Sequence, residues 1–272
     1  MPVVLVRHGE RLDYVQQGWV ATSQRPWDPP LTEQGKHMAT RAGIAIKQLL
    51  HAHLLPPVTQ VFSSPLIRCV ETATLAAASL DHQDKIAIEP ALVETICEHW
   101  YRAWAVPGAN AKWGGPPHCR LGVPVVESQL HPCALKPAGS LYHSAHQLHA
   151  LFGDVVHDGN GYIPTISADS LTHTWHKTET EGDLRRRMGA FAELCEEKYP
   201  GETVVLCSHG GPVVGCFEFL MQAEDSSELA CGYTAIFVLV KEEGRWRGLV
   251  KGSTDHLHEN EDLGLATAGK AA

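Results

Sequence analysis

Basic and nucleophilic side chains come directly after three short apolar runs of the sequence. They lie in the segments RHGER (residues 7–11), SSPLIR (63–68) and SHGG (208–211). Arginine matches phosphoryl oxygens with a planar fork of N–H donors, and a neutral histidine can attack phosphorus. The segments therefore predict a phosphoryl-transfer site built from three arginines and two histidines: Arg7, Arg11, Arg68, His8 and His209.

The apolar runs are typical of buried parallel strands because each is short and continuous. We predict strands at residues 2–6, 58–62, 86–88, 202–207, 235–240 and 245–250. Helices are predicted at 33–53 with Thr32 as N-cap, from Ser64 with Pro65 in the first turn, from Thr180 to about residue 199, and at 212–221.

Strands that alternate with helices predict an α/β fold. We expect a three-layer sandwich, with a mostly parallel central sheet, helices on both faces and a long insertion. Ligands of such sheets bind beyond the carboxyl ends of the strands. The three basic segments would lie there.

Composition limits the possible classes of protein. The chain has 272 residues, of which 44% are hydrophobic and 19% charged. We expect a single domain over 1–272, with an irregular insertion at about 95–175 and a polar tail from about 253. The net charge of −9 argues against a nucleic-acid binder. Since no apolar run approaches the roughly 18 residues of a membrane span, no membrane association is expected.

The cysteines indicate the redox state of the cellular compartment in which the protein is expected. The eight cysteines are scattered without a CxxC pair, and the first apolar run is too short for a signal peptide. Reduced thiols and a cytoplasmic location are therefore expected, with a nuclear location left open.

Four motifs together resemble a known family. LVRHGE (5–10), PLTEQG (30–35), SSPLIRCVETA (63–73) and SHGG (208–211) resemble branch one of the histidine phosphatase superfamily, the phosphoglycerate mutase-like group. The RHGER form is most similar to the phosphatase domain of the ubiquitin-associated, SH3-containing T-cell signalling suppressors and to steroid-phosphate phosphatases. The resemblance runs from residue 2 to about 222 and is thin over 100–175.

The resemblance implies roles for individual residues. His8 matches the nucleophile that becomes phosphohistidine, and Arg7, Arg11, Arg68 and His209 match the phosphoryl-binding pocket. Glu94 matches the acid–base carboxylate, with Glu89 and Glu98 as rival candidates. The implied activity is that of a phosphomonoesterase that needs no metal and no cofactor. Its substrate would be a phosphorylated small molecule or a phosphotyrosine-like group.

Two other functions compete with that of a phosphomonoesterase. A mutase is disfavoured, because phosphoglycerate mutases carry a serine where this chain has Arg11 and an asparagine where it has Tyr14. A scaffold or phospho-ligand reader, similar to the 55-kDa subunit of fungal transcription factor IIIC, is the main alternative. A homodimer is one candidate assembly, formed through the strand at 235–240 if that strand lies at a sheet edge.

Two further charged patterns are interpreted as surface. Three histidines at every third position drift around a helix, so we expect a solvated or substrate-lid surface and not a metal site at His143, His146 and His149. The arginine run 185–187 follows several carboxylates, which predicts a charge-balanced, solvated helix face.

Overall fold

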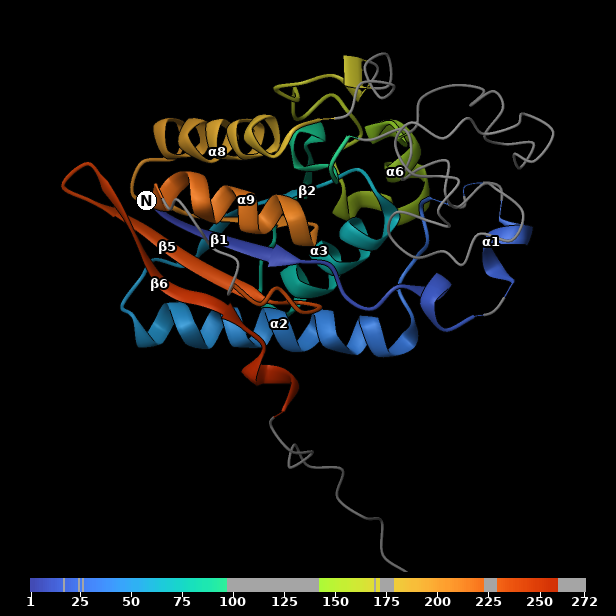
Figure 1. The fold of residues 1–272 in the computed structure, drawn as a ribbon, viewed down its shortest axis with the longest axis horizontal. Helices are drawn as coiled ribbons and strands as arrows, with labels where there is room; N and C mark the ends of the chain where they lie inside the picture. Colours follow the sequence, from blue (N-terminus) through green and yellow to red (C-terminus); the bar gives the residue numbers. More distant parts are fainter. Residues whose placement is uncertain are drawn as a thin grey trace, which may run out of the picture.

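A computed structural model describes residues 1–16, 18–23, 25, 27–96, 142–168, 170–171, 179–222 and 229–258. Within these residues, six strands form one sheet in the order β3-β2-β4-β1-β5-β6 (Figure 1). Their bounds are β1 Pro2–Arg7, β2 Val58–Ser63, β3 Ala87–Ile88, β4 Thr203–Ser208, β5 Ile236–Glu242 and β6 Arg245–Ser253. The β3, β2, β4 and β1 strands are parallel, and β5 runs antiparallel to both β1 and β6. The predicted α/β class with a mostly parallel sheet is confirmed.

Helices connect the strands. The α-helices are α1 Trp19–Thr22, α2 Glu33–Ala52, α3 Ile67–Ser79, α6 Ala145–Phe152, α8 Glu181–Lys198 and α9 Gly210–Met221. Short 3₁₀ helices occur at η1 Leu12–Tyr14, η2 Pro90–Leu92, η5 Gly153–Val155 and η6 Asp255–Leu257. Within the described ranges, no helix is long and apolar enough to cross a membrane.

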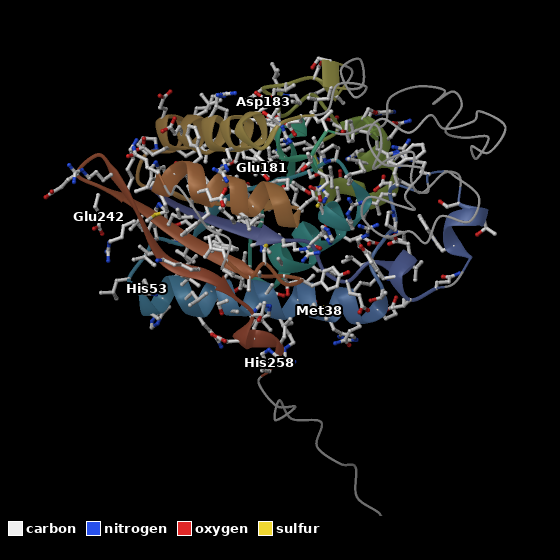
Figure 2. All side chains as sticks on the ribbon, in the orientation of Figure 1. Met38, His53, Glu181, Asp183, Glu242 and His258 are labelled. Atoms are coloured by element: carbon white, nitrogen blue, oxygen red, sulfur yellow. The ribbon has the colours of Figure 1, made fainter. Side chains whose placement is uncertain are left out.

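The helices cover both faces of the sheet. Val3 and Leu5 of β1 pack in a core with α8 and α9, whereas Val4 and Val6 pack in a second core with α2 and α3. Figure 1 shows α8 and α9 on one side of β1 and α2 on the other, and Figure 2 shows side chains filling the space between these layers. Successive strand residues point to opposite faces, so a continuous apolar strand supplies both cores.

Several helix boundaries agree with the predictions. The Thr32 hydroxyl accepts a hydrogen bond from the Gly35 N–H at 2.8 Å, and Thr180 forms a capping box with Asp183. The prediction of Ser64 as an N-cap is wrong. The α3 helix begins at Ile67, whose N–H donates to the Asp28 carboxylate at 2.8 Å.

The predicted position of the strand at 235–240 is also wrong. The β5 strand lies between β1 and β6, and the sheet edges are β3 and β6. Ladder bonds on both sides therefore occupy β5, which removes the reason for pairing two copies through it.

The insertion and the tail are described in part. Residues 142–171 carry α6 and η5, whereas 97–141 and 172–178 lie outside the described residues. The tail predicted from 253 includes η6, where His256 is buried. That the whole chain is one domain stays a prediction.

Two glycines allow the segment after β1 to contact the start of α2. A Cβ on Gly35 would clash with the carbonyl oxygen of Glu10, and a Cβ on Gly9 would lie 2.5 Å from the Gly35 carbonyl oxygen. The Thr32 N–H donates to the Glu10 carbonyl at 3.0 Å, which holds the two segments together. Close backbone approach thus explains the glycines of both motifs.

Gly35→Ala is expected to destabilise the protein by about 1–3 kcal/mol, because backbone atoms must move to admit the methyl group. Gly182→Ala is the matched control, since Gly182 is an exposed glycine in the first turn of α8, where an added Cβ would lie 3.9 Å from Thr180 Oγ1 without a clash. A helix normally gains up to about 1 kcal/mol from such a change. Urea unfolding midpoints at a constant m-value measure both effects. A neutral Gly35→Ala would show that the contact is not tight.

Candidate active site

The structure brings the predicted site residues together at the carboxyl edge of the sheet. Arg7 is the last residue of β1 and His8 follows it. His209 follows β4, and Arg68 lies in the first turn of α3 after β2. The rings of His8 and His209 are 5.2 Å apart between centroids. Glu94 Oε2 lies 3.9 Å from His209 Nδ1. The parallel strands therefore deliver these side chains to one buried place, as expected for such a sheet.

His8 is held as a neutral ring with a defined tautomer. Its Nδ1 lies 2.8 Å from the Gly9 carbonyl oxygen, which can only accept, so Nδ1 carries the proton and Nε2 has the lone pair. Burial, with the guanidinium groups of Arg68 and Arg7 adding to it, holds the pKa of His8 well below its usual range. His8 thus presents an unprotonated Nε2.

His209 has the opposite tautomer. Its Nδ1 accepts from Arg68 Nη2 at 3.2 Å, so its Nε2 carries the proton and donates to the Ser64 hydroxyl at 2.9 Å. Burial, reinforced by Arg68, keeps the pKa of His209 well below its usual range. Ser64 therefore orients a site histidine instead of capping α3.

Arg68 is fully enclosed. Its Nη1 donates to the Trp27 carbonyl oxygen at 3.3 Å and lies 3.9 Å from Asp28 Oδ1. Its Nε is buried without a hydrogen-bond partner among the described residues. An orphaned buried donor is costly, so this N–H is suited to an anion that enters the site.

Arg11 and Arg7 are each oriented by a carboxylate or an aromatic ring. Asp13 accepts from Arg11 Nε at 3.0 Å and from Nη2 at 2.6 Å, a bidentate pair that fixes the guanidinium plane. Arg7 Nη1 donates to the Cys231 carbonyl at 2.5 Å, and its guanidinium lies 4.6 Å from the Tyr233 ring centroid. Its Nε is buried without a hydrogen-bond partner among the described residues, like that of Arg68.

Glu94 is the candidate carboxylate that lies at the site. It is 5% exposed, and burial raises its pKa even though the Thr95 N–H and the nearby arginines lower it. Glu89 instead faces away: its carboxylate accepts from the Ala91 N–H at 2.8 Å and from the Tyr162 hydroxyl at 2.6 Å. Glu98 lies outside the described residues. Of the two candidates that the structure describes, the geometry favours Glu94 over Glu89 as the acid–base carboxylate.

Sequence reasoning missed Asp13, Ser64, Asp28 and Tyr233. Tyr233 was missed because it precedes β5, and β5 alone enters the sheet antiparallel, so the residues before it lie at the same edge. The bidentate partner of Arg11 had a usable signal, since a carboxylate two residues beyond an arginine can fold back on it. The contact between Ser64 and His209 spans 145 positions and had no local signal.

The histidine-rich segment does not form a metal centre in the described part of the chain. No group of three or more metal-ligating side chains occurs there. His149 Nδ1 donates to the Val156 carbonyl at 2.8 Å, which is a structural contact.

The sequence of the chain matches a known protein family. A model of the histidine phosphatase superfamily (branch 1) matches residues 3–108 and 157–253, more than half of the chain. The chain belongs to this superfamily. Its enzyme class is accordingly that of a phosphatase, and the resemblance of the motifs to this family is confirmed. The named subfamily stays a prediction. Comparison with curated protein sequences returned no significant match.

Solved structures share the fold. The ecdysone phosphate phosphatase of Bombyx mori is 19% identical with a TM-score of 0.57, covering 91% of each chain. A mycobacterial glucosyl-3-phosphoglycerate phosphatase is 17% identical with a TM-score of 0.53, covering 93% of this chain and 99% of its own. A phosphoserine phosphatase of Entamoeba histolytica is 18% identical with a TM-score of 0.50, covering 94% and 98%. At these identities the likeness establishes the fold alone.

Arg68→Lys tests the anion pocket. A lysine keeps the charge but cannot match the planar set of donors, so the inhibition constant of inorganic phosphate should rise about tenfold or more. Arg186→Lys is the matched control, because its side chain is 70% exposed and pairs with Asp183 on α8. Equal inhibition constants for both variants would show that Arg68 does not bind the phosphoryl group.

Proposed function

We propose that this phosphatase hydrolyses phosphate monoesters through a phosphohistidine on His8, with Glu94 as general acid and then general base, and without a metal ion. The observation that carries the proposal is the neutral His8 ring, with Nε2 unprotonated, among three guanidinium groups and one buried carboxyl. A charged imidazole could not attack phosphorus, and burial, with the neighbouring arginines adding to it, lowers the pKa of His8 and keeps the ring neutral.

In the first step, the guanidinium groups of Arg7, Arg11 and Arg68 bind the phosphoryl oxygens. His8 Nε2 attacks phosphorus in line with the leaving oxygen, and the bond from phosphorus to that oxygen breaks. The Glu94 carboxyl donates its proton to the leaving oxygen, so an alcohol departs. The Gly9 carbonyl, already bonded to the Nδ1 proton, stabilises the positive charge that develops on the ring.

In the second step, water attacks the phosphohistidine. The Glu94 carboxylate accepts the proton of this water while the bond from phosphorus to Nε2 breaks. Inorganic phosphate leaves, and both His8 and Glu94 return to their starting protonation states. The arginines offset the negative charge throughout, which is the role that a metal ion has in other phosphatases.

The proposed substrate is a phosphorylated small molecule or a phosphotyrosine-like group. Two tyrosine rings support this class. Tyr233 lies over the Arg7 guanidinium, and the ring centroid of Tyr14, which is 43% exposed, is 4.8 Å from Arg11 Cζ. Aromatic faces beside a phosphate pocket can contact an apolar leaving group. The silkworm relative is an ecdysone phosphate phosphatase.

His8→Ala tests the nucleophile. Turnover of an aryl phosphate with excess EDTA should persist in the wild type and fall by about 10⁴-fold or more in the variant, because the substitution removes the attacking nitrogen. Rapid acid-free quenching should trap a base-stable, acid-labile phosphoenzyme in the wild type alone. His51→Ala, at an exposed position on α2, is the control.

Two results would contradict the proposal. Loss of wild-type turnover on chelation would contradict metal independence. A folded wild type that binds phosphate ligands without releasing phosphate would identify a phospho-ligand reader or scaffold instead.

The pH dependence follows from the two shifted groups. The reaction requires a neutral His8, whose lowered pKa moves the acidic limb of kcat/KM below the usual histidine range. It also requires a protonated Glu94, whose raised pKa moves the alkaline limb above the usual carboxylate range. Activity should therefore peak under mildly acidic to neutral conditions.

Glu94→Gln should lower kcat/KM by about 10²–10⁴-fold and abolish the alkaline limb. The substrate phosphate ionises equally with both proteins. An alkaline limb that remains in the pH profile of Glu94→Gln therefore comes from the substrate and not from Glu94. An unchanged profile in Glu94→Gln would rule out this carboxyl as the acid.

A further inference from the structure

The backbone that carries Glu94 has little regular structure of its own. The η2 helix ends at Leu92, Val93 has extended backbone angles, and residues 93–96 belong to no helix or strand. The Glu94 carboxylate accepts from the Thr95 N–H at 2.9 Å, a contact within its own segment. The position of the carboxyl therefore depends on what holds the backbone on either side of it.

Arg187 of α8 holds this backbone on the N-terminal side. Its Nη1 donates to the carbonyl oxygens of Ala91 at 2.5 Å and of Val93 at 3.1 Å. The Arg187 side chain is 7% exposed, so these are buried, charge-assisted hydrogen bonds. Val93 is the immediate neighbour of Glu94.

Glu179 connects the same arginine to the other side of Glu94. Its carboxylate accepts from Arg187 Nε at 2.7 Å and from Nη2 at 2.8 Å. The carboxylate also accepts from the Ile96 N–H at 3.0 Å, and the Glu179 N–H donates to the Ile96 carbonyl at 2.8 Å. One ion pair thus fixes the backbone at positions 91, 93 and 96.

We propose that Arg187, paired with Glu179, is a positioning residue that sets where the Glu94 carboxyl meets the leaving oxygen, without contacting the substrate itself. This inference rests on the proposed acid–base role of Glu94. Both edges of the guanidinium are used at once, one on two carbonyls and the other on a carboxylate. A lysine keeps the charge but has no second edge. The sequence had suggested a solvated face for the 185–187 run, and for Arg187 this is wrong.

The dependence of kcat/KM on the leaving group tests the proposal, because a merely structural role of Arg187 would not change this dependence. A displaced acid matters most for leaving groups that need a proton, such as alkoxides, and least for 4-nitrophenolate. In Arg187→Lys, kcat/KM for an alkyl phosphate should fall at least tenfold more than kcat/KM for 4-nitrophenyl phosphate. The inhibition constant of inorganic phosphate should stay within twofold, because the arginines of the pocket are intact.

Three further variants complete the experiment. Glu179→Gln, which keeps the shape of the side chain, should show the same selective loss if Arg187→Lys fails to fold. Arg186→Lys, the adjacent exposed arginine, should show none; its partner Asp183 lies on the outer side of α8 (Figure 2). Adding Arg187→Lys to Glu94→Gln should cause little further loss, because a residue that acts through Glu94 has nothing left to position.

Each contrary outcome identifies what fails. Equal losses for both substrates, or additive losses in the double variant, would overturn the positioning role and leave the proposed function intact. If Glu94→Gln itself fails to change the dependence on the leaving group, the acid–base role of Glu94 is wrong and the role of Arg187 falls with it. Absence of wild-type turnover would overturn the proposed function before any variant is compared.

Discussion

The structure depends on holding several guanidinium groups out of water around two neutral histidines. Arg11 and Arg68 are each 1% exposed, and burial together with Arg11 lowers the pKa of Arg68. Like charges in a dry site are costly unless they are paired. The surrounding chain supplies these partners: a carboxylate for Arg11, carbonyl oxygens for Arg7 and Arg68, and aromatic rings over two of the three. Among the described residues this pairing is incomplete, because the buried Nε donors of Arg7 and Arg68 have no hydrogen-bond partner there and are suited to an anion.

The same concentration of charge fits the chemistry of both titratable groups. The guanidinium groups and burial act in one direction on His8, so both keep it neutral. On Glu94 they act in opposite directions, since the arginines favour the carboxylate and burial favours the neutral acid, and burial is the larger effect. A carboxyl placed nearer to the guanidinium groups would lose its proton and its use as an acid. In the proposed mechanism, the distance between Glu94 and the pocket therefore matters, and the segment that carries Glu94 must be held firmly.

The sequence was sufficient where the physics is local or periodic. Apolar runs predicted the strands, Thr32 and Thr180 predicted helix starts, and the residues after parallel strands predicted His8, Arg68 and His209 as neighbours. The sequence was insufficient where a residue contacts another that is far away along the chain. Ser64 followed by Pro65 matches an N-cap pattern, but its hydroxyl is bonded to His209 at the end of β4. Tyr233 precedes β5, and only the antiparallel direction of that strand, a tertiary feature, places it beside Arg7 and His8.

The arginine run of α8 shows why charge patterns alone cannot separate a surface from a support. Consecutive helix residues point about 100° apart, so three adjacent arginines face three environments. Arg186 is exposed and pairs with Asp183. Arg185 pairs with the buried carboxylate of Glu218 on α9. Arg187 points inward, where it contacts Glu179 and the backbone beside Glu94. The nearby carboxylates do balance the run, as its composition suggested. Helix geometry nevertheless decides which pair is solvated and which is enclosed, and the enclosed pair lies next to the site.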